Sequence, residues 1–179
     1  MKKIVVIVLC LFTVVMGILL FPQRATLDED CLRIHIRANS NSTDDQNIKY
    51  VVKDVVVDYL TPLLSEAKTK SEAKRIVLSN FNKIKEVADD VLKANGYSYR
   101  SNIVLHREEF PTRQYDDIVF EAGEYDALIV NLGEGVGNNW WCVAYPPLCF
   151  IGGESNGTNK IEYHSKLLEI IEQWKECHK

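Results

Sequence analysis

The chain has 179 residues, and its 21 Lys and Arg residues against 25 Asp and Glu residues give a net charge of −4. Without residues 1–21, which contain two lysines and no acid, 19 basic residues remain against 25 acidic ones, a net charge of −6. The basic residues are interleaved with acids, whereas a nucleic-acid-binding protein normally shows a basic stripe. We therefore expect no nucleic-acid partner, and residues 22–179 fit one ordinary globular domain.

The N-terminus carries an apolar segment behind a basic start. Lys2 and Lys3 precede residues 4–21, which contain no charged side chain. A segment of this kind is either a secretory signal peptide or an N-terminal membrane anchor, because its length approaches that of a membrane-spanning helix. Basic residues on its N-terminal side favour keeping that end in the cytoplasm. We therefore expect residues 1–24 to be a signal or anchor that meets the membrane through residues 4–21. The rest of the chain is then extracytoplasmic, either secreted or membrane-anchored.

The first half of the domain reads as a strand and two helices. Residues 32–37 alternate apolar and polar side chains, the period of a half-buried strand. Thr43 and Gln46 form a capping box that should begin a helix, and Pro62 should end or kink it. A second capping box, at Thr69 and Glu72, should begin one long amphipathic helix that stops at Gly96. The two helices should form a hairpin with their apolar faces turned inward.

The second half reads mainly as strands. Residues 97–107 and 117–120 are expected to be strands, and residues 124–132, apolar on both faces, a central strand. Residues 152–159 should form a flexible loop before a final helix from Ile161. The order predicts an α+β fold: a single domain with the helical hairpin and C-terminal helix packed on a mostly antiparallel sheet. We divide the chain into residues 1–24, an extracytoplasmic domain over 25–151, and a loop and C-terminal helix over 152–179.

Residues 133–150 form the densest group of aromatic, proline and cysteine side chains. The glycines at 133, 135 and 137 do not fit a dinucleotide-binding loop, because Asn138 stands where a third glycine is needed and no helix follows. We interpret Gly133, Gly135 and Gly137 as turn glycines. Trp140 and Trp141 would point to opposite faces of a strand, so at least one belongs to the core and the other is free as a contact.

The cysteines leave two alternatives open. Cys142 and Cys149 flank a segment whose prolines can bend it back, so these residues either form a short-loop disulfide or stay as two buried thiols. As thiols, either could act with His35 or His106 in a thiol-dependent hydrolase. The histidines have no spacing typical of a metal site, and no cofactor motif is present. We therefore expect no metal, no cofactor and no enzymatic activity.

The chain resembles the stage II sporulation protein R family of endospore-forming bacteria. The resemblance covers roughly residues 32–150, with Glu121 in place of a usual proline and Arg37 in place of a usual apolar residue. It rests on a set of short motifs: Arg33-Ile34-His35, Ala38-Asn39-Ser40-Asn41-Ser42, Asp45-Gln46, Lys49, Phe110-Pro111-Thr112-Arg113, Tyr115, Ala122-Gly123-Glu124-Tyr125, Ala127-Leu128, Gly133-Glu134-Gly135, Asn139-Trp140-Trp141-Cys142 and Pro146-Pro147-Leu148-Cys149-Phe150.

The resemblance implies a non-enzymatic signal of endospore formation. Such a protein is made in the forespore and exported to the space between the forespore and mother-cell membranes. There it activates a membrane-embedded aspartic protease of the mother cell, which processes pro-sigma-E. A structural domain of the spore or wall is a further alternative. On the signalling interpretation, aromatic anchors would form the surface that meets the protease, with Cys142 and Cys149 fixing its shape. The expected partner-binding residues are Asn139, Trp140, Trp141, Tyr145, Pro146, Pro147, Leu148 and Phe150.

Overall fold

A four-stranded sheet organises the fold. The computed structural model describes residues 30–115, 118–150 and 158–177. In the sheet the strand order is β2-β5-β1-β6, with β1 parallel to β5 and the other two pairs antiparallel. The bounds are β1 (Leu32–Arg37), β2 (Ser101–Phe110), β5 (Gly123–Leu132) and β6 (Asn139–Tyr145). The predicted α+β fold with a mostly antiparallel sheet is confirmed, and residues 124–132 do form a central strand.

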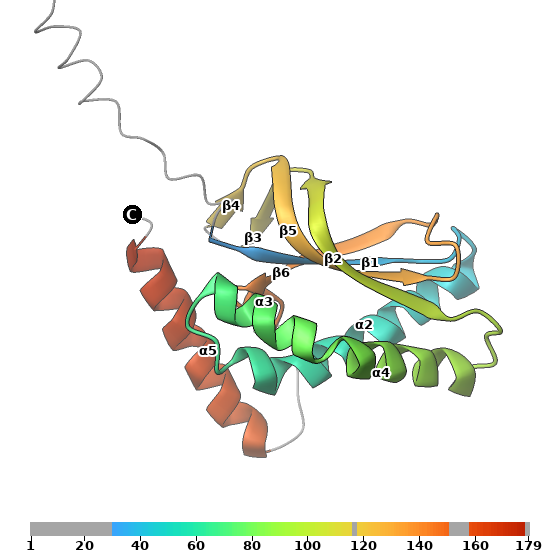
Figure 1. Cartoon of the computed structure of the whole chain (residues 1–179), viewed down its shortest axis with the longest axis horizontal. Helices are drawn as coiled ribbons and strands as arrows, with labels where there is room; N and C mark the ends of the chain where they lie inside the picture. The colour runs from blue at the N-terminus through green and yellow to red at the C-terminus, as the bar shows by residue number, and fades with distance from the viewer. Residues whose placement is uncertain (1–29, 116–117, 151–157, 178–179) are drawn as a thin grey trace, which may run out of the picture.

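Three helices cover one face of this sheet (Figure 1), namely α2 (Thr43–Leu64), α3 (Lys70–Ser79) and α4 (Phe81–Ala94). The sheet contributes Ile34, Ile36, Leu128 and Val130 to the core between the layers, all fully buried. Fully buried helix residues at spacings of three or four complete this core: Val52, Val56, Leu60, Leu64, Ile84, Ala88 and Leu92. Apolar burial of this kind is the main favourable term in folding.

Helix α2 differs from the expectation at both ends and along one side. Its N-cap is Ser42, one residue before the expected Thr43, and the Ser42 hydroxyl accepts the Asp45 N–H at 3.2 Å. Pro62 lies inside the last turn, and the helix ends two residues later at Leu64. Not all of its apolar side chains turn inward, since Val51 and Val55 stay 44% and 37% exposed.

The second predicted helix is two helices. Thr69 caps α3 as expected, accepting the Glu72 N–H at 3.2 Å. Asn80 then separates α3 from α4, and its side-chain amide donates to the Ile76 carbonyl at 2.8 Å. Gly96 stops α4 with a φ of +81°, and the following Tyr97 N–H donates to the Leu92 carbonyl. Such a left-handed glycine closes a Schellman motif, which satisfies carbonyls at the helix end.

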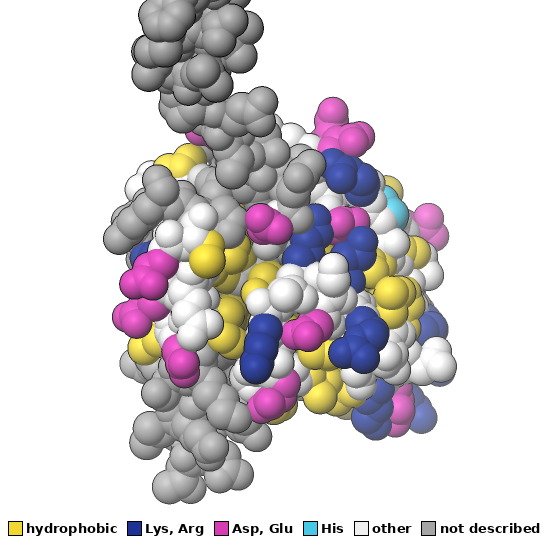
Figure 2. Space-filling model, turned by 60° about the vertical axis from the view of Figure 1, so that its left-hand side comes forward, with side chains coloured by type: hydrophobic (Ala, Val, Ile, Leu, Met, Phe, Trp, Pro, Cys, Tyr) yellow, Lys and Arg dark blue, Asp and Glu magenta, His cyan; other side chains and the backbone are white. Residues whose placement is uncertain are grey.

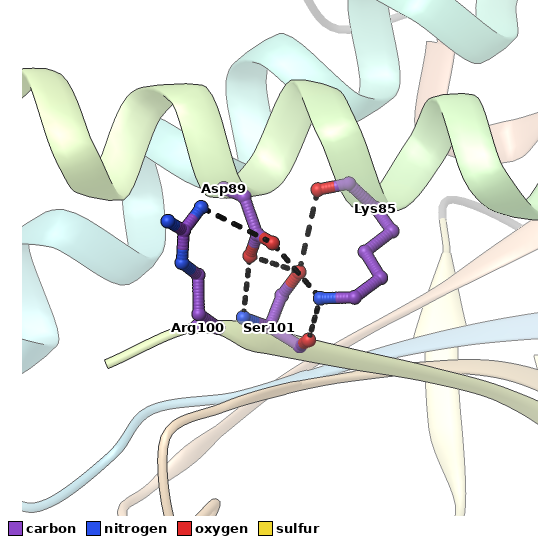
Figure 3. Close-up of polar contacts among 4 residues, drawn as sticks. All are labelled: Lys85, Asp89, Arg100 and Ser101. Carbon is purple, nitrogen blue, oxygen red and sulfur yellow. Dashed lines mark hydrogen bonds and ion pairs between the residues drawn. The ribbon is translucent and has the colours of Figure 1, made fainter. Parts of the chain in front are cut away.

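A buried polar cluster joins α4 to the start of β2 (Figure 3). Asp89 accepts the Ser101 N–H at 2.6 Å and the Ser101 hydroxyl at 2.8 Å. The Lys85 ammonium donates to Asp89 at 2.8 Å and to the Ser101 carbonyl at 2.6 Å. Burial raises the pKa of Asp89, but the hydrogen bonds from Lys85 and Ser101 outweigh it and hold the pKa below its usual range. The cluster fixes the first residue of β2 against the helix layer.

The remaining strands also shift from the expected positions. β2 begins at Ser101 rather than at Tyr97 and runs on to Phe110. A two-stranded sheet follows, of β3 (Arg113–Tyr115) and β4 (Ile118–Phe120), where only the second strand was predicted. Strand β1 is buried on both faces and not half-buried. The β3–β4 pair explains this, because the Arg33 guanidinium carbon lies 5.9 Å from the Tyr115 ring centroid and 5.3 Å from that of Phe120.

The C-terminal helix α5 (Thr158–Cys177) begins before the expected Ile161, within what was predicted as loop. Residues 152–157 of that loop, like residues 1–24, lie outside the described part of the chain. Trp174 of α5 stacks on Phe120, with ring centroids 6.0 Å apart. On the side seen in Figure 2, Lys and Arg side chains are interleaved with Asp and Glu. Across the described ranges, no helix combines the length and apolarity that crossing a bilayer requires.

Candidate partner-binding surface

The glycine loop between β5 and β6 is a turn, as its spacing predicted. Gly133 and Gly135 have φ values of +56° and +63°, a region in which side chains other than glycine are strained. Gly137 is needed for a different reason. A Cβ on Gly137 would lie 2.1 Å from the Ser40 carbonyl oxygen, so only glycine fits against the β1–α2 loop.

Asparagines of the β1–α2 loop hold this turn in place. The Asn39 side-chain oxygen accepts the Glu134 N–H at 2.9 Å, and that of Asn41 accepts the Asn138 N–H at 2.6 Å. The Gly137 N–H donates to the Ala38 carbonyl at 2.9 Å. Three hydrogen bonds thereby join two segments that are almost 100 residues apart in the sequence. The sequence predicted the turn but not that the Ala38–Ser42 motif holds it in place.

Asp45 anchors the same loop from α2. Its carboxylate accepts hydrogen bonds from Asn39 (2.9 Å), Ser40 (2.5 Å) and Tyr99 (2.6 Å). Burial raises the pKa of Asp45, but these donors outweigh burial and lower it below the usual value. Next to it, burial lowers the pKa of Lys49, whose ammonium donates to the Asn138 carbonyl at 3.1 Å. The loop that leads into β6 is therefore held in place by hydrogen bonds to the β1–α2 loop and to α2.

The two tryptophans of β6 point to opposite faces of the sheet. Trp140 pairs with Ile36 and lies on the helix side, with the Lys53 ammonium 5.7 Å from its ring centroid. Trp141 pairs with His35 and lies on the other face. Both side chains are half-buried. A partner could therefore contact Trp141 on the sheet face that points away from the helices. Strand β6 is also an edge strand of the sheet.

Polar and aromatic side chains from four strands gather around Trp141. We call this surface the Trp141 face and define it by His35, Arg37, Glu108, Arg113, Asn139 and Trp141. Arg113 lies over the indole, with its guanidinium carbon 4.5 Å from the ring centroid. Across the sheet, Glu108 reaches from β2 to β1 and bonds both His35 and Arg37. These six residues come from separate parts of the sequence and are brought together only by the fold.

His35 is held as a neutral imidazole within this surface. Burial and the charge of Arg37 lower its pKa to about 4, although the Asn139 side chain acts to raise it. Its Nδ1 lies 2.8 Å from the Glu108 carboxylate, which the Arg37 guanidinium also contacts. A neutral ring that donates from Nδ1–H leaves Nε2 as an acceptor. That Nε2 is buried and meets no donor with hydrogen-bond geometry in the described structure.

Arg33 lies next to this surface as a fully buried cation. Its Nε donates to the Cys142 carbonyl at 3.2 Å, and its guanidinium carbon lies 4.5 Å from the Phe110 ring centroid and 5.0 Å from that of Tyr125. Aromatic faces stabilise such a cation through the ring quadrupole. Nη1 and Nη2 nevertheless have no hydrogen-bond acceptor among the described residues. An arginine in this state is exceptional, since buried charges are normally paired.

The other expected contact residues differ in exposure along the chain. Asn139 is exposed and Leu148 is half-buried in the short helix η1 (Leu148–Phe150). The Tyr145 side chain is buried and its hydroxyl donates to the Lys68 carbonyl at 2.5 Å. Pro146, Pro147 and Phe150 are also buried. Residues 145–150 thus pack mostly into the interior. Among residues 139–150, the accessible side chains are concentrated at the N-terminal end.

Cys142 and Cys149 form a disulfide in the structure. With both sulfurs bonded, neither is available as the thiolate nucleophile that a thiol-dependent hydrolase requires. Within the described ranges, no group of three or more His, Cys, Asp and Glu side chains is placed to hold a metal ion.

The fold and this surface define an α+β domain with an arginine- and tryptophan-bearing sheet face. A family model described as stage II sporulation protein R matches residues 28–155. The chain is also 33% identical over 177 aligned residues to the stage II sporulation protein R of Bacillus subtilis (strain 168), covering 93% of this chain and 79% of that protein. No solved structure matches the chain. The chain therefore belongs to the stage II sporulation protein R family.

Sequence reasoning overlooked much of the Trp141 face. Arg37 and Glu108 were not considered as site residues, and Arg33 was placed on a half-buried strand. No signal in the sequence pointed to Arg37 or Glu108, because Glu108 lies in none of the motifs and Arg37 departs from the usual residue. The motifs at Arg33–His35 and at residues 110–113 nevertheless converge on Trp141 in space. The motif residues at 38–49 and 133–135 belong to the support described above.

Proposed function

We propose that this chain is an exported, non-catalytic signal of endospore formation that triggers a membrane-embedded aspartic protease to process pro-sigma-E. Membership of the stage II sporulation protein R family supports a role in sporulation. The apolar segment at residues 4–21 supports export, and the Trp141 face supplies a surface for a protein partner. Half-buried tryptophan and arginine side chains of this kind are typical of interface anchors.

One observation carries the proposal furthest. Two of the motifs that identify the family, from β1 and from the segment after β2, meet a third in β6 on the sheet face that the helices leave uncovered. Core packing alone does not require an arginine stacked on a half-buried tryptophan at this place. Such a pair suits a surface that receives a partner, because Arg and Trp combine large contact area with directed hydrogen bonds.

Reconstitution in a non-sporulating host tests this function. The full chain is co-expressed with the protease and pro-sigma-E, and processing is followed by immunoblot. We expect processing only when the full chain is present, and its loss when residues 1–24 are removed, because the domain is then not exported. Processing that proceeds equally without the chain would contradict the proposal and favour a structural role in the spore or wall.

A further inference from the structure

The Trp141 face has more positive than negative charge in an acidic chain. Its arginines are Arg37 and Arg113, with Arg33 buried beside them, and its carboxylate is Glu108. Glu108 is already engaged by Arg37 and His35. Arg113 is exposed and stacks on Trp141, and no carboxylate contacts it in the described part of the chain. The Arg113 guanidinium is therefore held in position by Trp141, and no carboxylate among the described residues neutralises its charge.

Unmet hydrogen-bonding groups concentrate at the same place. Trp141 Nε1 and both Nη atoms of Arg33 are buried donors without an acceptor among the described residues. Arg33 is fully buried and His35 is 3% exposed, so both are well beyond nine-tenths buried. Buried polar groups normally find partners, and a cluster of unpaired ones requires an explanation. Here three of the four unpaired atoms are donors, and the fourth is the acceptor His35 Nε2. The interior beside the face is therefore electropositive, which favours an anionic ligand.

The stacking of Arg113 prepares it for one ligand chemistry. A guanidinium held over an indole ring can still offer its N–H groups to a carboxylate, which binds with two parallel hydrogen bonds. The ring also restricts the arginine side chain, which lowers the entropy lost on binding. The buried Arg33 adds a positive charge nearby without needing to touch the ligand. The buried Trp141 Nε1–H adds its dipole to the same electropositive environment.

We propose that the Trp141 face binds a carboxylate side chain, Asp or Glu, on an exposed segment of the protein partner. This proposal rests on the proposed function, and it names the chemistry by which that partner is recognised. A peptide acid is favoured over an anionic lipid surface, because the chain carries an excess of acidic side chains, with a net charge of −4. Such charges oppose a flat anionic surface more than a single acidic side chain.

The test uses the full-length chain in neutral detergent micelles and a blocked peptide, acetyl-Gly-Glu-Gly-Glu-Gly-amide. The indole N–H signals of the three tryptophans are followed by NMR, assigned with single Trp→Phe variants. We expect the Trp141 signal to shift saturably, with a Kd on the order of 1 mM, while those of Trp140 and Trp174 stay in place. The matched peptide with glutamine in both positions should produce no saturable shift.

Two variants make the result specific. Arg113→Gln removes the stacked cation and should weaken peptide binding at least fivefold, on the order of a lost charge-assisted hydrogen bond. Arg75→Gln removes one exposed positive charge from α3, on the helix side, and should leave binding unchanged. Equal shifts with the glutamine peptide, or equal binding by Arg113→Gln, would overturn carboxylate recognition. Binding to phosphatidylglycerol vesicles that Arg113→Gln abolishes, with no peptide shift, would overturn it in favour of a lipid headgroup.

The pro-sigma-E processing assay separates this proposal from the proposed function. Arg113→Gln that loses both peptide binding and processing supports the two together. A wild-type chain that triggers processing but does not bind the peptide keeps the proposed function and overturns carboxylate recognition. Peptide binding in a wild-type chain that triggers no processing supports the carboxylate site and overturns the assignment of its partner.

Discussion

The indole ring of Trp141 lies edge-on to the imidazole ring of His35, with ring centroids 5.4 Å apart. The two residues are direct partners in the antiparallel pairing of β6 with β1, so this contact is fixed by the register of the sheet. Phe110 approaches both rings, at 5.7 Å from His35 and 6.4 Å from Trp141. Edge-to-face aromatic contacts of this kind contribute about 0.5–1.5 kcal/mol each beyond area burial. The arrangement positions Trp141 rigidly at the uncovered face.

Alanine variants of the two adjacent tryptophans should have similar effects on stability but different effects on pro-sigma-E processing. Trp141→Ala and Trp140→Ala each truncate a half-buried ring, so both should lower the free energy of unfolding by about 1–3 kcal/mol. Only Trp141→Ala should abolish pro-sigma-E processing, because Trp140 faces the helices. Urea unfolding and the processing assay, run on both variants, check this. Equal loss of processing in both at matched stability would contradict the assignment of the face.

His35 should make stability depend on pH. Its pKa is about 4 in the folded chain, lowered by burial and by Arg37, against 6.5 in the unfolded chain. Between these values the unfolded state binds more protons, so the free energy of unfolding is largest above about pH 6.5 and decreases as the pH falls towards 4. Urea unfolding at about pH 7 and about pH 5 measures the change.

The control for this pH dependence is the exposed His106. His106→Gln should keep the decrease in stability between the two pH values, whereas His35→Gln should lack most of it. An NMR titration of the His35 ring in the unmodified chain provides an independent reading. A His35 that titrates near 6.5 would contradict the expectation.

Gly137 should tolerate alanine less well than Gly96 does. At Gly137 an added Cβ would meet the Ser40 carbonyl oxygen at 2.1 Å, so the two loops must move apart, at a cost of about 2 kcal/mol or more. At Gly96 the φ of +81° strains an alanine, but no atom lies within 4 Å, so the cost should be nearer 1 kcal/mol. Chemical denaturation of both variants compares them. A Gly96→Ala that is the more damaging would contradict the close approach at Gly137.

Asp89 should contribute more to stability than its neighbour Asp90. Asp89→Asn weakens a buried cluster with Lys85 and Ser101, and about 1–3 kcal/mol should be lost at neutral pH. Because the folded pKa is below the unfolded value, this contribution is present above about pH 4 and is lost as the pH falls through the folded pKa. The exposed Asp90→Asn should change stability by less than about 0.5 kcal/mol. Unfolding curves from about pH 7 down to about pH 3 compare the two variants.

The disulfide between Cys142 and Cys149 should stabilise the folded chain. Its cysteines are seven positions apart, and by the loop-entropy estimate the bridge contributes roughly 2–3 kcal/mol. The double variant Cys142→Ser/Cys149→Ser should lose about that amount in urea unfolding. Non-reducing digestion and mass spectrometry of the unmodified chain should recover the two cysteines in one linked peptide. A single, rapidly alkylated thiol at either position would instead revive the hydrolase alternative.

Local signals in the sequence anticipated several elements well. Thr69 and Gly96 bound the α3–α4 segment because capping depends on a few neighbouring backbone groups. Apolar residues on both faces of residues 124–132 located the central strand. The same reasoning missed the break at Asn80, since the apolar period continues across it and the break depends on an amide that bonds the Ile76 carbonyl and accepts from Tyr59. Pro62 was expected to end or kink α2 and lies in its last turn instead, where few backbone bonds remain to be lost.

By itself the sequence determined the α+β class, the central strand, the turn glycines and the resemblance to a sporulation family, because each depends on local periodicity, backbone freedom or a string of neighbouring residues. Only the tertiary structure decided which tryptophan is available, why Arg33 is buried and how Glu108 joins His35 to Arg37. These facts depend on strand order and register, which bring residues about 70 to 110 positions apart onto one face. Pairing between distant strands is set by the packing of the whole domain, and no local pattern encodes it.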